Sequence, residues 1–171
     1  RTLFAQPFDS LALEIKINRE LIRTAAMLHD IGKFVLLAAL QTVAGKKALD
    51  TDFSEALVRE ILSTMHVEQG LRLFDEWQLP EAYRAVVLEH HLEELETLDT
   101  MITLVKLANK GCRKIGLGLD KNSDMVLPTT GEAQFLGIDE IALAEFEIML
   151  EDRFFCLRAV TGERPDSSNV V

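Results

Sequence analysis

The chain has 171 residues, of which 48% are hydrophobic and 6% aromatic, and its formal net charge is −10. The length fits a single domain with one sizeable core, and the abundance of Leu, Ala, Ile and Glu favours helices over strands. The negative charge argues against nonspecific binding to nucleic acid and against attachment to an anionic membrane, because both depend on Lys and Arg side chains that meet phosphates.

The N-terminal part of the chain predicts two helices. The first is short and runs from Phe8 to Ile17. Asn18 is suited to cap a second, long helix of about residues 19–43, in which apolar residues recur every three or four positions. From Phe34 to Leu40 this helix is apolar on all sides, so we expect its second half to be deeply buried.

The middle of the chain predicts three shorter helices. Asp52 begins a pattern that resembles a capping box at a helix start. We expect a break near Ser63 to His66 and a separate helix from Val67 to Trp77. Pro80 suits the first turn of the next helix, which ends near the double histidine His90-His91.

Two further helices complete the predicted fold. One runs from Leu98 or Thr100 to Ile115 and the other from Ile138 to Val160, and polar turn residues make residues 120–131 a loop. With no convincing strand, the predicted fold class is all-α, a helical bundle. We expect residues 1–160 to form one domain and residues 161–171 to form a loose C-terminal tail.

A run of basic residues on the helix that starts at Thr100 departs from the acidic balance of the chain. Its members are Lys106, Lys110, Arg113 and Lys114. They are close enough in sequence to share one helix face and form a local basic patch. The alternative is a solvated helix face, which is the more common role of such a run.

The two cysteines, Cys112 and Cys156, are too few and too far apart to suggest a disulfide framework, so we expect a reduced, cytoplasmic setting. Neither has a histidine at motif spacing, which leaves a thiol nucleophile unsupported. No signal peptide opens the chain, and no apolar run reaches the roughly 18 residues of a membrane span. The chain begins at Arg1 without a Met, so we expect it to be a fragment of a longer protein.

An adjacent pair, His29 and Asp30, interrupts the apolar run of the long helix. Burying two such side chains is costly unless each finds a partner. One interpretation is that the imidazole and the carboxylate converge on a metal ion beside the helix. The other is a buried pair that only holds helices in register. Lys33 follows one turn later and suits either a phosphate contact or an ion pair with a neighbouring carboxylate.

The sequence has four histidines, and all of them fall at helix centres or ends: His29, His66, His90 and His91. A glycine one turn after His66 lets a second helix approach that face closely. Imidazole is a versatile metal ligand, and Asp30 adds the hard oxygen that iron, manganese or magnesium prefers. The four histidines and Asp30 are therefore candidate ligands of a divalent metal such as Fe, Mn, Mg or Zn.

The segment Leu28-His29-Asp30-Ile31-Gly32-Lys33 resembles the signature of the HD superfamily of metal-dependent phosphohydrolases. Further motifs follow in order: His66-x-x-x-Gly70, Trp77-x-Leu79-Pro80, His90-His91 and Leu107-Ala108-Asn109. Together they resemble the HDOD branch, the HD-related output domains of bacterial signalling proteins, and more distantly the HD-GYP cyclic-di-GMP phosphodiesterases. The resemblance covers about residues 11–152 and implies an HD-type helical bundle, of which this chain is the C-terminal half.

Two departures from the active HD pattern bear on function. The resemblance implies a first histidine ligand near Arg1 to Phe4, where this sequence has none. It also implies an aspartate ligand in the helix after the double histidine, at the position that Asn109 takes here. An amide keeps a carbonyl oxygen but carries no charge, so it binds a divalent cation far more weakly than a carboxylate does.

By resemblance, the first hypothesis is a catalytically degenerate output module of bacterial signalling that binds a protein or a ligand and holds no metal or a weakly bound one. Its partner is a signalling protein or a fused signalling domain. The alternative is a metal-dependent phosphohydrolase that acts on a nucleotide or cyclic dinucleotide, with Lys33 steadying the phosphate. A third interpretation is a structural site in which His29, Asp30 and one of the other histidines hold a single metal ion.

Overall fold

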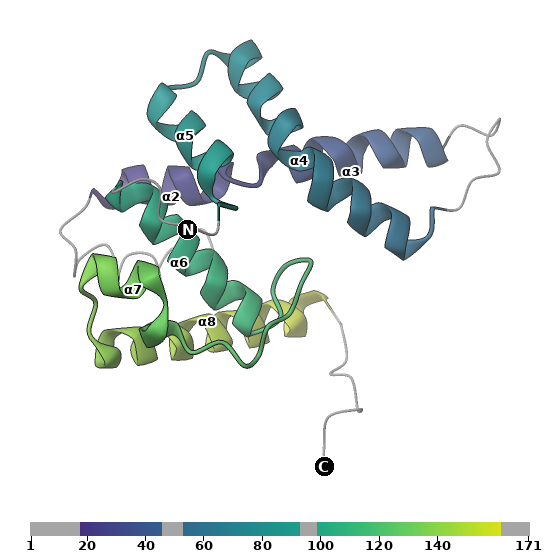
Figure 1. Cartoon of the computed structure of the whole chain (residues 1–171). Coiled ribbons are helices and arrows are strands. Elements are labelled where there is room, and N and C mark those ends of the chain that lie inside the picture. Colours follow the sequence, from purple (N-terminus) through teal and green to yellow (C-terminus); the bar gives the residue numbers. More distant parts are fainter. Residues whose placement is uncertain (1–17, 46–52, 93–98, 162–171) are drawn as a thin grey trace.

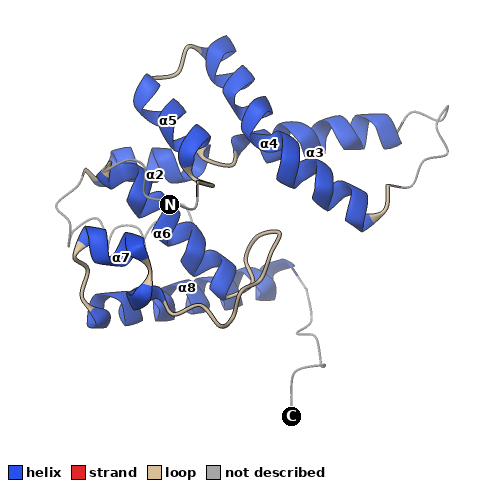
Figure 2. Cartoon of the chain, in the orientation of Figure 1, coloured by secondary structure: helices blue, strands red, loops and turns tan. Residues whose placement is uncertain are grey.

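The computed structural model describes residues 18–45, 53–92 and 99–161. These residues fold into an all-α bundle without a strand, as the sequence predicts, and Figure 2 shows helices joined by loops throughout. The helix expected over residues 8–17, the helix start expected at Asp52 and the tail from residue 162 lie outside the described residues.

Helices α2, Arg19–Leu28, and α3, Ile31–Ala44, replace the single long helix that the sequence predicts. The side chain of Asn18 caps α2 as expected, accepting hydrogen bonds from two backbone N–H groups of the first turn. The prediction of an unbroken helix is wrong because Asp30 leaves the helical conformation, with φ −110° and ψ 15°. Its carboxylate makes no capping bond to α3 and lies 2.6 Å from the amine of Lys33.

Helix α4, Glu55–Trp77, is continuous, so the predicted break near Ser63 to His66 is wrong. That segment contains no proline or glycine, and its two hydroxyl groups donate to the backbone carbonyl of Glu60, at 3.0 and 2.7 Å. Bonds of this kind can bend a helix without ending it. The side chain of Ser54 caps the start of α4.

Three more helices have bounds close to the predicted ones: α5, Glu81–Glu89, α6, Thr100–Lys114, and α8, Glu140–Thr161. The predicted loop over residues 120–131 contains a short 3-10 helix, η1, Leu127–Thr129, and is followed by α7, Gly131–Leu136. The sequence does not predict α7 because six residues are too few to show an apolar repeat. Thr130 caps its start, and Gly137 ends it with a φ of +63° that favours glycine.

The core of the fold surrounds α6. In Figure 1, α2 and α5 lie on one side of this helix and α7 and α8 on the other, and α6 contacts all four. At Gly111, α8 approaches so closely that a Cβ atom would lie 2.7 Å from the ring of Phe146. The largest apolar side chains buried in this cluster are Ile22, Leu104, Leu107, Leu127, Leu143, Phe146 and Leu150.

Helices α3 and α4 form an arm that extends away from this core (Figure 1). They cross at Gly32, where a Cβ atom would lie 1.8 Å from the carbonyl oxygen of His66, so the approach requires glycine. The expectation that Phe34 to Leu40 is deeply buried is wrong. Leu36 is buried, but Phe34 is 67% exposed, because α4 covers one face of α3 and leaves other apolar residues facing outward.

The helical stretch Arg19–Ala44 is long and apolar enough to cross a membrane, judged by length and composition only, and an 18-residue window within it has a mean hydropathy of 1.3. By this criterion of length and mean hydropathy, the expectation that no apolar run reaches the length of a membrane span does not hold. The stretch is interrupted between α2 and α3, however, and the ion pair of Asp30 and Lys33 lies near its middle. Because ionised side chains are costly in the hydrocarbon of a bilayer, the length criterion is weak support for a membrane span.

The basic run of α6 forms neither a shared patch nor a simple solvated face. Lys106 is buried. Lys110 pairs with the buried Glu132 of α7 at 2.6 Å, and Lys114 pairs with Glu147 of α8 at 2.7 Å. Both predicted alternatives are therefore wrong for Lys110 and Lys114, because their charges join α6 to α7 and α8.

Candidate metal centre

Four candidate ligands come from three parts of the fold. Asp30 lies at the junction of α2 and α3, and His66 lies in the middle of α4. His90 and His91 directly follow the last residue of α5. The close crossing at Gly32 places the start of α3 against the turn of α4 that carries His66. Each ligand is thus held by the end or the centre of a helix, as the sequence predicts for the histidines.

The ligand atoms of these four side chains converge on one another. One carboxylate oxygen of Asp30, Oδ1, lies 3.5 Å from His66 Nε2 and 3.5 Å from His90 Nε2. His66 Nε2 and His91 Nε2 are 2.8 Å apart. All four ligand atoms lie within 4.8 Å of one another, so a single small ion placed among them could contact every one.

The backbone fixes which ring nitrogen faces the carboxylate. His90 Nδ1 donates to the carbonyl oxygen of Val87 at 2.9 Å, and His29 Nδ1 donates to that of Ala26 at 2.8 Å. The Nε2 atoms of both rings therefore point toward Asp30, yet neither they nor Asp30 Oδ1 has a hydrogen-bond partner among the described residues. Because a nitrogen lone pair repels a carboxylate oxygen, this arrangement calls for a cation or a proton between them.

The donor set fits one divalent ion. Three imidazole nitrogens and one carboxylate oxygen form a mixed set that suits zinc, iron or manganese, whereas magnesium prefers oxygen ligands and fits less well. The hydrogen bond from His90 Nδ1 to a backbone carbonyl is the kind of contact that fixes the orientation of a metal-binding imidazole. The group is thus compatible with a weakly bound metal, and its orphaned polar atoms are the observation that supports this.

The charge states near neutral pH also suit a cation. Burial lowers the pKa of His66, and burial together with the neighbouring histidines lowers the pKa of His91 to about 4. Burial alone would raise the pKa of Asp30, but the adjacent histidine rings and the amine of Lys33 hold that pKa well below its usual range. At pH 7 the carboxylate is ionised and these two imidazoles are neutral, which are the forms that bind metals.

Two predicted site residues stand beside the four-ligand group. His29 Nε2 lies 3.3 Å from the carboxylate of Asp30 but is not among the converging ligand atoms. Lys33 bonds the same carboxylate at 2.6 Å, so the structure has the ion pair that was one of its two predicted roles. Whether His29, Asp30 or the other histidines bind a metal, and whether Lys33 contacts a phosphate, stays a prediction.

A hollow of about 370 Å³ opens beside the group. Asp30, His66 and His91 line one part of it, and α6 contributes Asn109 and Arg113. The Nε atom of Arg113 is buried and has no hydrogen-bond acceptor in the described part of the chain. The sequence offers no signal for Arg113 as a site residue, because it stands within a run of basic residues whose common role is a solvated helix face.

A second hollow of about 300 Å³ adjoins the first and shares Asp30 and Lys33 with it. The other side chains that line it are mostly apolar and come from the arm, among them Phe34, Leu37 and Leu62. The candidate site therefore has a polar part next to the histidines and an apolar part along α3.

A family model of the HDOD domain matches residues 4–93, more than half of the chain. The chain belongs to the HDOD domain family. The match contains Asp30, Lys33 and the four histidines, and it ends before α6. The family suggested by the sequence motifs is therefore confirmed. The equivalence of Asn109 to an aspartate ligand lies outside the matched residues and stays a prediction.

A curated relative of this HDOD chain is an uncharacterized protein of Synechocystis sp. (strain ATCC 27184 / PCC 6803 / Kazusa), 30% identical over 83 residues. The matched segment is 48% of this chain and 10% of the relative, so the chain spans about a tenth of the length of the relative it matches. No solved structure matches the chain. Membership of a family sets the fold, whereas function has to be argued from the site.

Proposed function

We propose that this HDOD chain is an output module of bacterial signal transduction that binds a ligand or a partner protein and does not turn over a substrate. In this proposal the module works in the cytoplasm, and its partner is a signalling protein or a fused signalling domain. A divalent ion in its histidine–aspartate group is held weakly.

The observation that carries the proposal is the shortage of negative charge around the ligand group. Asp30 is the one carboxylate in the group, and Lys33 already bonds it at 2.6 Å. The hollow beside it presents the neutral amide of Asn109 and the cation of Arg113, and its second carboxylate, Asp120, lies 3.8 Å from an arginine of α4. Hard divalent cations such as manganese and magnesium depend on anionic oxygen ligands, so this environment favours weak occupancy by them.

Binding could act on the fold through the arm. A ligand that contacts Asp30 and His66 touches both helices of the arm at their crossing, where Gly32 leaves no space for adjustment. Since the two helices pack backbone to backbone there, a small shift of one must move the other. A change between two packed arrangements of the arm is therefore the kind of response that a binding module can pass to a partner.

The second candidate function is a metal-dependent phosphohydrolase acting on a nucleotide or cyclic dinucleotide. Two observations favour it: the four ligand atoms converge within 4.8 Å, and Lys33 and Arg113 place two cations beside them. A bound metal would supply Lewis acidity at the phosphorus. The residues of the chain would then bind and orient the phosphate, with Arg113 offering a guanidinium whose buried Nε has no acceptor among the described residues.

Metal content and turnover together test the proposal. We expect the purified protein to carry well below one equivalent of iron, manganese or zinc by elemental analysis. We also expect no hydrolysis of cyclic-di-GMP or simple phosphodiesters when manganese or iron is added. The variants Asp30→Ala and His66→Ala should behave like the parent in this assay, as should Asp124→Ala, a control at an exposed carboxylate outside the ligand group.

The proposal would be overturned in favour of the phosphohydrolase if the protein carried a full equivalent of metal and showed metal-dependent turnover. That turnover would have to be lost in Asp30→Ala and His66→Ala and kept in Asp124→Ala. Turnover that survives in all three variants would point to a contaminating enzyme and leave the binding role standing.

A further inference from the structure

Helix α8 carries apolar side chains on two opposite faces. One face is buried against the core and includes Leu143, Phe146 and Leu150. The other carries Ile141, Ile148 and Phe155, which are 74, 59 and 77% exposed. A helix that only covers a core needs one apolar face, so the second face calls for its own explanation.

The three exposed residues are evenly spaced. Ile141, Ile148 and Phe155 follow one another at intervals of seven residues, which keeps them on one side of α8 over residues 141–155. A seven-residue apolar repeat supplies one of the two apolar positions per heptad through which two helices pack along their length. We name these three residues the outer stripe of α8.

Acidic residues flank the outer stripe. Glu145 and Asp152 lie on one side of it and Glu140 and Glu151 on the other, and all four are exposed. Two outer stripes packed together would place these carboxylates close to one another, in a chain whose net charge is already −10. Like charges across an interface disfavour pairing, so the charge pattern argues against a second copy as the occupant. It equally argues against an anionic membrane surface.

We propose that the outer stripe of α8 is a docking site for an amphipathic helix of a partner protein, whose apolar seam is flanked by Lys and Arg. The apolar seam covers the three exposed side chains, and the basic flanks face the four carboxylates. This surface shares no residue with the histidine–aspartate group, so the docking proposal does not depend on whether that group binds a metal.

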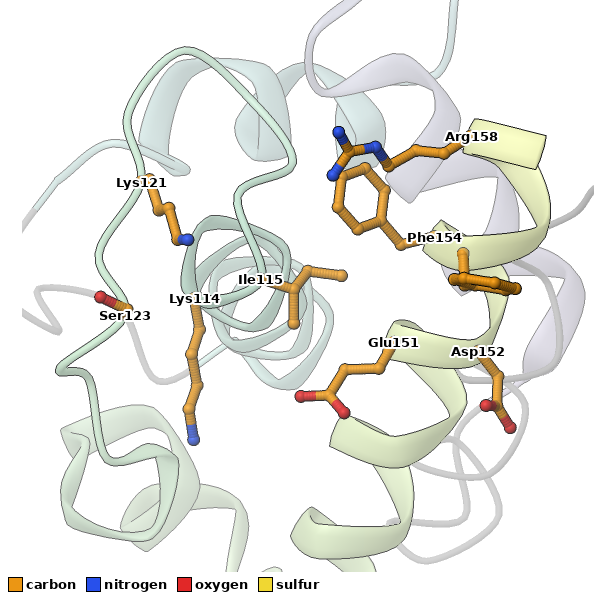
Figure 3. A pocket seen from close by; sticks show the side chains of 9 residues that line it. Lys114, Ile115, Lys121, Ser123, Glu151, Asp152, Phe154 and Arg158 are labelled. Atoms are coloured by element: carbon orange, nitrogen blue, oxygen red, sulfur yellow. The ribbon is translucent and has the colours of Figure 1, made fainter. Parts of the chain in front are cut away.

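A hollow at the C-terminal end of the stripe extends the same surface. It measures about 580 Å³ and lies between α8 and the segment that follows α6. Figure 3 shows Ile115, Phe154 and the stem of Lys121 facing this space, with the guanidinium of Arg158 over the ring of Phe154. Phe155 also lines it, so a large side chain at the end of a docked helix has a place to enter next to the last residue of the stripe.

Peptide binding by the full chain tests the proposal. The probe is a synthetic, fluorescently labelled peptide of three heptads with Leu on the seam and Lys on the flanks, and its partner probe has Glu in place of Lys. We expect saturable binding of the basic peptide by fluorescence anisotropy at physiological salt, and none of the acidic peptide. Ile148→Glu should weaken the affinity for the basic peptide by about tenfold or more, since it removes an isoleucine that the docked peptide would bury in the middle of the interface.

The choice of glutamate separates apolar docking from simple charge attraction. Ile148→Glu adds a negative charge, so a purely electrostatic complex with the basic peptide would tighten. Leu88→Glu is the matched control, since Leu88 is 51% exposed on α5 and lies outside the stripe. We expect this variant to bind as the parent does, and circular dichroism of both variants checks that the fold is kept.

Other outcomes would overturn the proposal. Equal or tighter binding by Ile148→Glu would show that charge alone attracts the peptide. A dimer of the parent chain, seen by light scattering and lost in Ile148→Glu, would assign the stripe to a second copy. Binding of the parent to anionic phospholipid vesicles that Ile148→Glu abolishes would assign it to a membrane.

Discussion

Asp30 is the residue at which the candidate centre is assembled. It lies within 3.5 Å of three histidine rings and bonds Lys33. The sequence predicts this convergence only in part. Burial cost and motif order single out Asp30 and the histidines, because such groups need partners in an apolar run. The ion pair of Lys33 was one of the two roles predicted for it. Arg113 was not singled out, since an arginine in a basic run has several common uses.

The charge states at this site predict how stability depends on pH in protein treated with a chelator. In the unfolded chain a histidine titrates near its ordinary pKa of 6.5, whereas in the folded chain His91 has a pKa of about 4 and that of His66 is lowered as well. Between these values the unfolded state binds more protons than the folded state. The free energy of unfolding should therefore fall as the pH is lowered from 6.5 toward 5, because protonation favours unfolding.

Urea unfolding followed by circular dichroism at several pH values measures this effect. The window above pH 5 separates the histidines from most carboxylates, which titrate lower. His91→Gln removes one of the groups responsible, so its unfolding midpoint should change less between pH 6.5 and 5 than that of the parent. A parent midpoint that stays constant or rises on acidification through this window would contradict the assignment of neutral, buried imidazoles.

At the scale of elements, local sequence signals predicted the start of α2 and the bounds of α6 and α8, but they did not predict how the helices of the arm break and pack. The Asn18 cap and the bounds of α6 and α8 follow from capping residues and apolar repeats. The break between α2 and α3 depends on what Asp30 contacts in space, and the outward face of α3 depends on which helices reach it. Both features depend on tertiary contacts, which cannot be predicted from a continuous apolar run.

The crossing of α3 and α4 gives a prediction about Gly32. A methyl group there would lie 1.8 Å from the carbonyl oxygen of His66 and 2.7 Å from the amide nitrogen of Gly70. Because both neighbours are backbone atoms, the collision is relieved only by moving a helix. We expect Gly32→Ala to lower the free energy of unfolding by about 3 kcal/mol. Thermal melting and urea unfolding measure the change.

Gly45 provides the matched control for this substitution. It ends α3 at a φ of −75°, which other residues adopt. Among the described residues, a methyl group there would approach only the helix's own carbonyls, at 3.3 Å or more. Gly45→Ala should alter the free energy of unfolding by less than about 1 kcal/mol. If Gly32→Ala proved as mild as Gly45→Ala, the helices of the arm would not be in the close contact described for them.

At the scale of the whole molecule, the candidate centre lies where the arm meets the core. Asp30 and His66 belong to the arm, whereas His90 and His91 follow α5, which packs on α2 and α6 as well as on α4. An ion held by all four would therefore join the two parts of the fold. The expectation that residues 1–160 form one domain stays a prediction, because its first 17 residues lie outside the described part.

This placement predicts how metals affect thermal stability. An ion that binds the folded state alone raises stability with the logarithm of its concentration relative to the dissociation constant, by about 2.7 kcal/mol when that ratio is about 100. If the centre binds weakly, a strong chelator should leave the melting temperature of the purified protein unchanged, while an excess of zinc or manganese raises it. His66→Ala should abolish the rise, because it removes the ligand from α4, whereas Asp124→Ala should retain it. A large fall in melting temperature on adding the chelator alone would mean that a tightly bound metal holds the arm to the core, as in the structural interpretation of the site.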